Sequence, residues 1–200
     1  YVATAIGFII VTLAGYAAVG RAVIGSNAAV AWTIGSPATF INAAVAHTGF
    51  LVGGLFGGGL LALRRQPILA GVLFGLLAVK PQLGLLVPVA LIAGGHGRAI
   101  LAAIGTIAAM VLLSVQAYGL EPWLAMPAQL ERVADIFSDG RVDFNMLVTV
   151  YGALRWFAVP HATAIAVQAI VSLGLVVAVF RLWRSDATFE LKAAGLIVAS

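Results

Sequence analysis

Lys80 is the residue of this 200-residue chain best suited to chemistry. It begins a Lys80-Pro81-Gln82 turn between two apolar runs, residues 68–79 and 83–93. If these runs lie in a bilayer, an ammonium group there costs about 2.5–3.5 kcal/mol, and such a residue is by default a candidate for function. A lipid phosphate at the outer leaflet would offset this cost. The alternative is a lysine that extends to the headgroups, beside a proline that only breaks the helix.

A second polar turn, His47-Thr48-Gly49, follows the apolar run at residues 27–46. His47 could donate a hydrogen bond to a sugar or a phosphate, or it could cap or pack helices. Asn42 and Gln82 offer amides, which in membrane helices often only bridge neighbouring helices. The sequence has no cysteine and no metal-ligand or phosphate-loop motif, so we expect no metal and no cofactor.

The carboxylates gather in a polar stretch at residues 119–145. This stretch holds five of the seven acidic residues, namely Glu121, Glu131, Asp135, Asp139 and Asp143. A general base must lie within hydrogen-bond reach of the proton that it removes, and spacing alone does not show this. We therefore assign no catalytic residue among them.

The composition indicates a membrane protein. The chain is 62% hydrophobic and 9% charged, with a mean hydropathy of +1.11, whereas soluble domains carry about 25% charged residues. Runs such as residues 162–180 approach the ~20 residues that cross a bilayer as a helix. The net charge of +4 does not indicate nucleic-acid binding, because most arginines end apolar runs instead of forming a basic stripe. We predict an all-α, polytopic transmembrane helical bundle with short broken helices and an extracytoplasmic loop.

The expected spans lead to a topology. They cover residues 2–20, 27–46, 50–63, 68–79, 83–93, 99–118 and 162–180, with another from about residue 193, while residues 146–159 lie at the interface or re-enter the membrane. The arginine ends at positions 21, 64–65, 98 and 181–184 then share one side, which the positive-inside rule makes cytoplasmic. The runs flanking Lys80 are only about 18 Å long as helices, so this turn should lie below the outer surface. The glycine run at residues 53–59 predicts close helix packing.

The ends of the chain predict a fragment of a longer protein. Tyr1 leads directly into an apolar run without an initiator methionine, and Ser200 falls inside another such run. We expect a single transmembrane domain over residues 1–200, truncated at both ends.

Several segments resemble glycosyltransferase family 87, which are bacterial polyprenyl-phosphate-mannose-dependent mannosyltransferases of the GT-C fold. The resemblance covers most of the chain and is clearest over residues 40–118. It rests on Gly49-Phe50-Leu51, Arg64-Arg65-Gln66-Pro67-Ile68-Leu69-Ala70-Gly71-Val72-Leu73, Lys80-Pro81-Gln82-Leu83, Pro88 and Arg98. The family usually has glutamine and asparagine in its first polar turn, where this chain has His47 and Thr48.

The resemblance implies an inverting transfer of a hexose, mannose in that family, from a polyprenyl phosphate to a lipid or glycan acceptor. The active side would be extracytoplasmic, at the plasma membrane. Lys80 would stabilise the leaving phosphate, with His47, Thr48 and Gln82 as further substrate-binding residues. The usual GT-C base is an aspartate in the first outer loop, and nothing here corresponds to it, so we expect the base before residue 1.

Two other functions fit the residues alone. A transporter or flippase for a lipid-linked or small anionic substrate would also use broken helices and a buried lysine, although no inverted repeat relates the two halves. A non-catalytic scaffold of an envelope complex would tolerate a neutral residue in place of Lys80.

Overall fold

The computed structural model describes residues 2–45, 47–144 and 147–200, and the regular elements of this part are all helices. Four positions used above as boundaries, Tyr1, Ala46, Asn145 and Met146, lie outside the described residues. The all-helical architecture confirms the predicted fold class.

Three helices are long and apolar enough to cross a membrane: α1 (Val2–Ile24), α8 (Gly97–Tyr118) and α11 (His161–Arg184). At 1.5 Å per residue they measure about 33–36 Å, which exceeds the ~30 Å hydrocarbon core. Their sides are largely open, and Ala99 is the one buried residue of α8. This pattern suits lipid-facing helices, since an apolar side chain needs no burial in a bilayer.

The other apolar segments are shorter. The second expected span is two helices, α2 (Ala28–Gly35) and α3 (Pro37–Ala44), with Ser36 extended between them. Pro37 causes this break, because the residue before a proline is disfavoured in helical conformation. Helix α4 (Gly49–Leu63) follows.

Next comes a hairpin of α5 (Pro67–Leu76), the 3₁₀ turn η1 (Leu77–Val79), α6 (Pro81–Gly84) and α7 (Val87–Ala93).

Glycines bring these helices close together. A Cβ atom at Gly75 would lie 2.6 Å from Thr106 Cβ of α8, and one at Gly71 would overlap the carbonyl oxygen of Ala99. Glycines 53 and 57 of α4 face Tyr16 and Val19 of α1 in the same way, and Gly59 faces Phe74 of α5. In a bilayer the hydrophobic effect does not drive helices together, so close packing through small residues helps to hold these helices in contact. The predicted role of the glycine run is confirmed.

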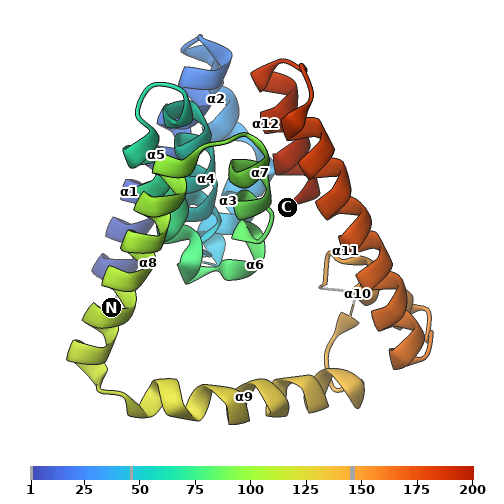
Figure 1. Ribbon diagram of the computed structural model, residues 1–200. Helices are drawn as coiled ribbons and strands as arrows, with labels where there is room; N and C mark the ends of the chain where they lie inside the picture. The colour runs from blue at the N-terminus through green and yellow to red at the C-terminus, as the bar shows by residue number, and fades with distance from the viewer. Residues whose placement is uncertain (1, 46, 145–146) are drawn as a thin grey trace.

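The polar stretch differs from the loop that we expected. Most of it is an 18-residue helix, α9 (Glu121–Ser138), which Figure 1 shows running crosswise from the lower end of α8 toward that of α11. Pro122 occupies its first turn, where a missing N–H costs nothing, and Pro127 lies inside it. A short helix, α10 (Val150–Trp156), then packs on α11, and α12 (Phe189–Ala199) folds back along α11.

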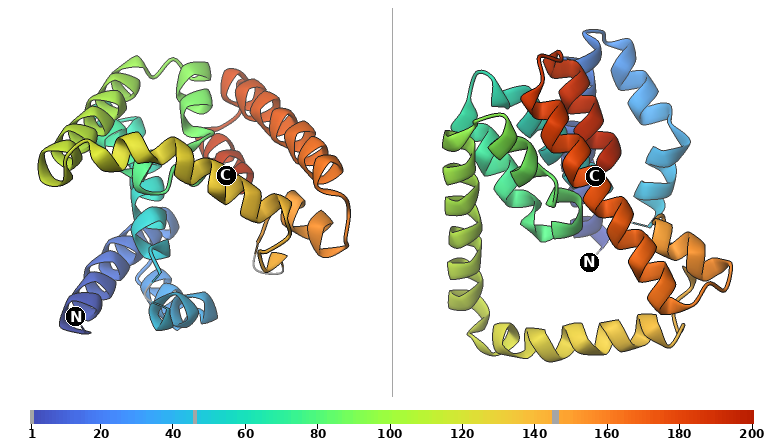
Figure 2. Two further views of the ribbon diagram at one scale, coloured as in Figure 1. Left: turned by 90° about the horizontal axis from the view of Figure 1, so that it is seen from below. Right: turned by 45° about the vertical axis from the view of Figure 1, so that its right-hand side comes forward.

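The connections that carry arginines lie at one end of the molecule. Figure 1 shows the links α1–α2, α4–α5, α7–α8 and α11–α12 together at the top, and Figure 2 shows α9 across the opposite end. These links or the helix turns beside them hold arginines 21, 64, 65, 98, 181 and 184. The helices thus place these arginines on one side, as the charge pattern predicted. We call this end of the molecule the arginine end.

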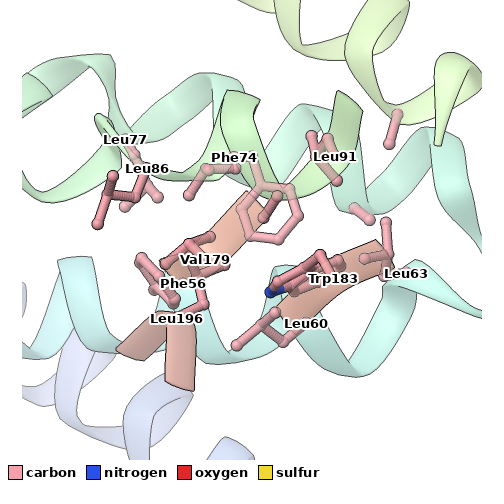
Figure 3. Packing of buried hydrophobic residues seen from close by; sticks show 14 of the residues in the cluster. Phe56, Leu60, Leu63, Phe74, Leu77, Leu86, Leu91, Val179, Trp183 and Leu196 are labelled. Atoms are coloured by element: carbon pink, nitrogen blue, oxygen red, sulfur yellow. The ribbon is translucent and has the colours of Figure 1, made fainter. Parts of the chain in front are cut away.

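One buried cluster joins the hairpin to the C-terminal helices. Figure 3 shows Trp183 and Val179 of α11 and Leu196 of α12 beside Phe56 and Leu60 of α4. Trp183 is only 3% exposed. The cluster holds α11 and α12 against α4 and the hairpin, although 97 residues (64–160) separate α4 from α11 in the chain.

Candidate functional site

Lys80 stands where η1 ends and α6 begins. Its N–H donates to the carbonyl of Leu77 at 2.8 Å, and its own carbonyl accepts from Leu83 N–H at 3.2 Å. Its backbone is non-helical, with φ −143° and ψ 72°, because Pro81 follows it. The side chain is partly buried. Within the described part of the chain, no carboxylate lies within ion-pairing distance of it, since the one salt bridge found there joins Arg141 to Asp139.

The turn at Lys80 lies well short of the far end of α8. The segment Pro67–Val79 starts at the arginine end and measures about 20 Å, whereas α8 starts at the same end and measures about 33 Å. The difference of about 13 Å leaves the turn recessed, and Figure 1 shows α6 well above the level of α9. A charged group at this depth needs water or an anion near it.

The second polar turn joins α3 to α4. The amide Nδ2 of Asn42 donates to the carbonyl of His47 at 3.3 Å, and the N–H of His47 donates to the carbonyl of Asn42 at 3.0 Å. Asn42 therefore has a structural role in closing this turn. His47 and Thr48 are exposed, and neither side chain forms a hydrogen bond with the described residues. Both remain available to a ligand.

A cavity of about 540 Å³ connects the two turns. Gly49, which follows Thr48, and Leu83, which follows Gln82, both line it, together with apolar side chains of α1, α4 and α12. The cavity is mostly apolar, as a site for a lipid chain would be. The four predicted site residues are not part of the lining. Thr48 and Gln82 directly precede a lining residue, and His47 and Lys80 precede one by two and three positions. No hydrogen bond in the described structure links one of these side chains to another.

A second apolar cavity adjoins the same tip. It has a volume of about 300 Å³ and is lined by Leu77, Pro81 and Leu85 of the tip, with Ile107 of α8 among its other walls. The residues on either side of Lys80 thus contribute to two separate apolar spaces. A chain lying in either space would have a polar end near the tip.

The sequence analysis missed a polar network at the end of the molecule opposite the arginine end. The Tyr151 hydroxyl lies 2.9 Å from His161 Nδ1 and donates to the carbonyl of Phe137 at 3.3 Å, while Tyr151 N–H donates to Gln168 Oε1 at 2.9 Å. Beside it, Arg155 stacks on the Phe144 ring, 5.1 Å from its centre. These contacts join α9, α10 and α11. Spacing gave no signal for them, because their members stand up to 31 positions apart (137 to 168) on three helices.

The sequence model of glycosyltransferase family 87 matches residues 1–200. The chain belongs to glycosyltransferase family 87. No curated protein and no solved structure matches it. The family match confirms the resemblance read from the Lys80-Pro81-Gln82 turn and the arginine-rich link before α5, and it accounts for the whole chain, α9 included.

Membership in family 87 identifies this protein as a membrane glycosyltransferase. Its reaction requires a sugar donor, an acceptor and a bilayer. The family therefore favours the first of the three functions considered above over the transporter and the scaffold. The described residues also hold no group of three histidine, cysteine or acidic side chains placed to bind a metal ion.

Proposed function

We propose that this family 87 protein transfers a hexose, mannose in the first instance, from a polyprenyl phosphate to a hydroxyl group of an envelope lipid or glycan. The observation that carries the proposal is Lys80. It is a cation on a recessed turn, flanked by two apolar cavities and without a carboxylate partner among the described residues. A polyprenyl phosphate has the matching chemistry, an anionic head on a long apolar chain.

In the reaction, the acceptor hydroxyl oxygen forms a bond to the anomeric carbon of the sugar. The bond from that carbon to the phosphate oxygen breaks, and its electron pair leaves with the polyprenyl phosphate. The hydroxyl proton passes to a base, which we do not assign within residues 1–200. Attack from the face opposite the leaving group inverts the anomeric centre.

Lys80 would stabilise the charge that grows on the leaving phosphate. Two unit charges 4 Å apart attract by about 4 kcal/mol at an effective dielectric of 20. The ammonium is placed before the reaction starts, so it costs no reorganisation when the charge develops. His47, Thr48 and Gln82 carry side chains that can donate hydrogen bonds to the phosphate or the sugar.

The arginine end supports an orientation with this turn open to the outer side. Positive-inside distribution assigns the arginine end to the cytoplasm. The Lys80 turn opens away from that end, toward α9. The donor would then enter from the outer leaflet, at the plasma membrane.

The test uses the full-length protein in membranes with radiolabelled polyprenyl-phosphate-mannose. We expect Lys80→Ala to lose about 10²–10³-fold in transfer rate, the usual cost of removing one electrostatic group. Lys80→Arg should retain part of the rate. Arg132→Ala removes a charge from exposed α9 and serves as the matched control, with a rate near that of the wild type.

Each result has a distinct meaning. Equal rates for Lys80→Ala and Arg132→Ala would refute the role of Lys80 while keeping the donor. Absence of transfer by the wild type from any of several polyprenyl-phosphate sugars would refute the donor itself.

A further inference from the structure

A separate polar cavity lies at the arginine end, on the opposite side of the hairpin from the Lys80 turn. Its volume is about 420 Å³. Three connections far apart in the chain build it: Arg64 comes from the α4–α5 link, His96 from the α7–α8 link, and Thr188 from the α11–α12 link. None of these residues contributes to the proposed transfer reaction.

The cations of this cavity lack carboxylate partners. Arg64 and Lys192 both line it, and Glu190 is the one carboxylate in the lining. No ion pair joins Glu190 to either cation in the described structure. The guanidinium of Arg64 instead lies over the Phe189 ring, with 5.8 Å between its central carbon and the ring centre. The N–H groups of the guanidinium point outward in its plane and have no hydrogen-bond partner among the described residues, so they are free to bind an anion.

The buried Trp183 fixes the backbone at Lys192 and contacts His96. The Trp183 indole N–H donates to the carbonyl of Lys192 at 3.1 Å, and its ring meets His96 edge-on, with the ring centres 6.0 Å apart. Burial, with a smaller effect of the Lys192 charge, lowers the pKa of His96, which keeps its imidazole neutral. The Thr188 hydroxyl accepts from Leu191 N–H at 3.4 Å and caps α12, whose positive helix end also faces the cavity.

We propose that this cavity binds the phosphate ester of an anionic phospholipid headgroup. Basic pockets between membrane helices on the cytoplasmic side commonly hold such headgroups. The arginine end is where headgroups of that leaflet would lie, and Arg64 and Lys192 supply two positive charges against the single carboxylate of Glu190. A bound phosphate would add a further connection among the three links, beside the Trp183 cluster and the contact of Arg64 with Phe189. The site is independent of the proposed transfer reaction.

The test measures lipid binding through the melting temperature of the purified full-length protein in neutral detergent. We expect phosphatidylglycerol to raise the melting temperature, with a smaller rise from phosphatidylcholine of the same chain length. Each cation near a headgroup is worth about 1 kcal/mol, or roughly five-fold in affinity. The double variant Arg64→Gln/Lys192→Gln should therefore bind about 30-fold more weakly.

The matched control is Arg65→Gln/Arg98→Gln. It removes the same charge from the same end, but neither of its arginines lines the cavity. It should keep the full lipid-dependent rise. Arg64→Lys/Lys192→Arg preserves charge and should keep most of it, which separates binding from folding. Glu190→Gln removes the carboxylate and should strengthen binding.

A third ligand, glycerol 3-phosphate, identifies the source of the phosphate. A rise with phosphatidylglycerol alone, lost in the Arg64/Lys192 variant, supports the site with the membrane as its source. If glycerol 3-phosphate also raises the melting temperature, and the Arg64/Lys192 variant loses both rises, the site is supported and a soluble phosphate ester is enough to fill it. Equal losses in the two double variants, or no rise in the wild type, would overturn the proposal.

Discussion

Replacing Gly75 by alanine tests whether α5 and α8 hold the Lys80 turn in place through backbone contact. The new methyl carbon would lie 2.6 Å from Thr106 Cβ and 2.8 Å from the carbonyl oxygen of Ala103, and ordinary contact begins at 3.4 Å. Neither atom is the far end of a flexible side chain, so the helices must separate by about 0.6–0.8 Å (3.4 − 2.8 and 3.4 − 2.6). Lys80 follows Gly75 by five positions and would move with α5.

The expected cost follows from two opposing terms. Overpacking costs about 1–3 kcal/mol. Alanine also gains up to about 1 kcal/mol over glycine in a helix interior. Gly105→Ala in α8 serves as the control for the alanine gain, because it makes the same helix change with no atom within 4 Å of the new carbon. The difference between the two variants is therefore the packing cost of about 1–3 kcal/mol.

The assay is thermal unfolding of the purified protein, with sugar transfer measured in parallel. A change of 1 kcal/mol shifts the melting temperature by about 2–4 °C for a chain of this size, so Gly75→Ala should melt about 2–12 °C below Gly105→Ala. Transfer should also fall in Gly75→Ala. If Gly75→Ala melted at or above Gly105→Ala, the α5–α8 contact would not be the constraint that we describe.

Two further predictions concern the ends of the molecule. Because burial lowers the pKa of His96, the unfolded chain takes up its proton first as pH falls through 6.5. The stability from neutral His96 is thus present above that pH and is lost as pH falls to the folded pKa. Melting curves of His96→Gln should show a weaker acid destabilisation than the wild type, and matching curves would contradict this. Tyr151→Phe removes the hydroxyl contacts to His161 and Phe137, at a cost of about 1 kcal/mol, and should speed amide exchange in α9, whereas unchanged exchange would show that other contacts hold this joint.

Much of the architecture follows from the sequence because a bilayer imposes simple rules. The three long spans are strongly apolar, arginines end the segments on one side, and the glycine run of α4 packs on α1 and α5. Pro81 ends η1, and the short segments around it predict a recessed Lys80. The positions of His47 and Thr48 in a turn before α4 were also predictable, since apolar runs flank them on both sides.

The remaining features depend on contacts between distant segments. The charged residues of the polar stretch predicted a loop there, and only the structure shows that most of it is a helix that accommodates Pro127. The cavity at the arginine end needs Arg64, His96 and Lys192, which are 32 and 96 positions apart (64 to 96 to 192). Close approach of Gly49 and Leu83 to one cavity is likewise a result of packing α4 against the hairpin, which no local pattern encodes.

Helix α9 is long compared with the distance between packed helices. An 18-residue helix spans about 27 Å, nearly three times the 8–10 Å between the axes of packed helices. Because it runs from the lower end of α8 toward that of α11, its length contributes to the spacing of the two long helices there, together with residues 139–160, which connect it to α11. A longer α9 would add about 5.4 Å for each helical turn gained. Evolution or design could therefore lengthen this crosswise connection by adding turns to α9, while leaving the packed hairpin unaltered.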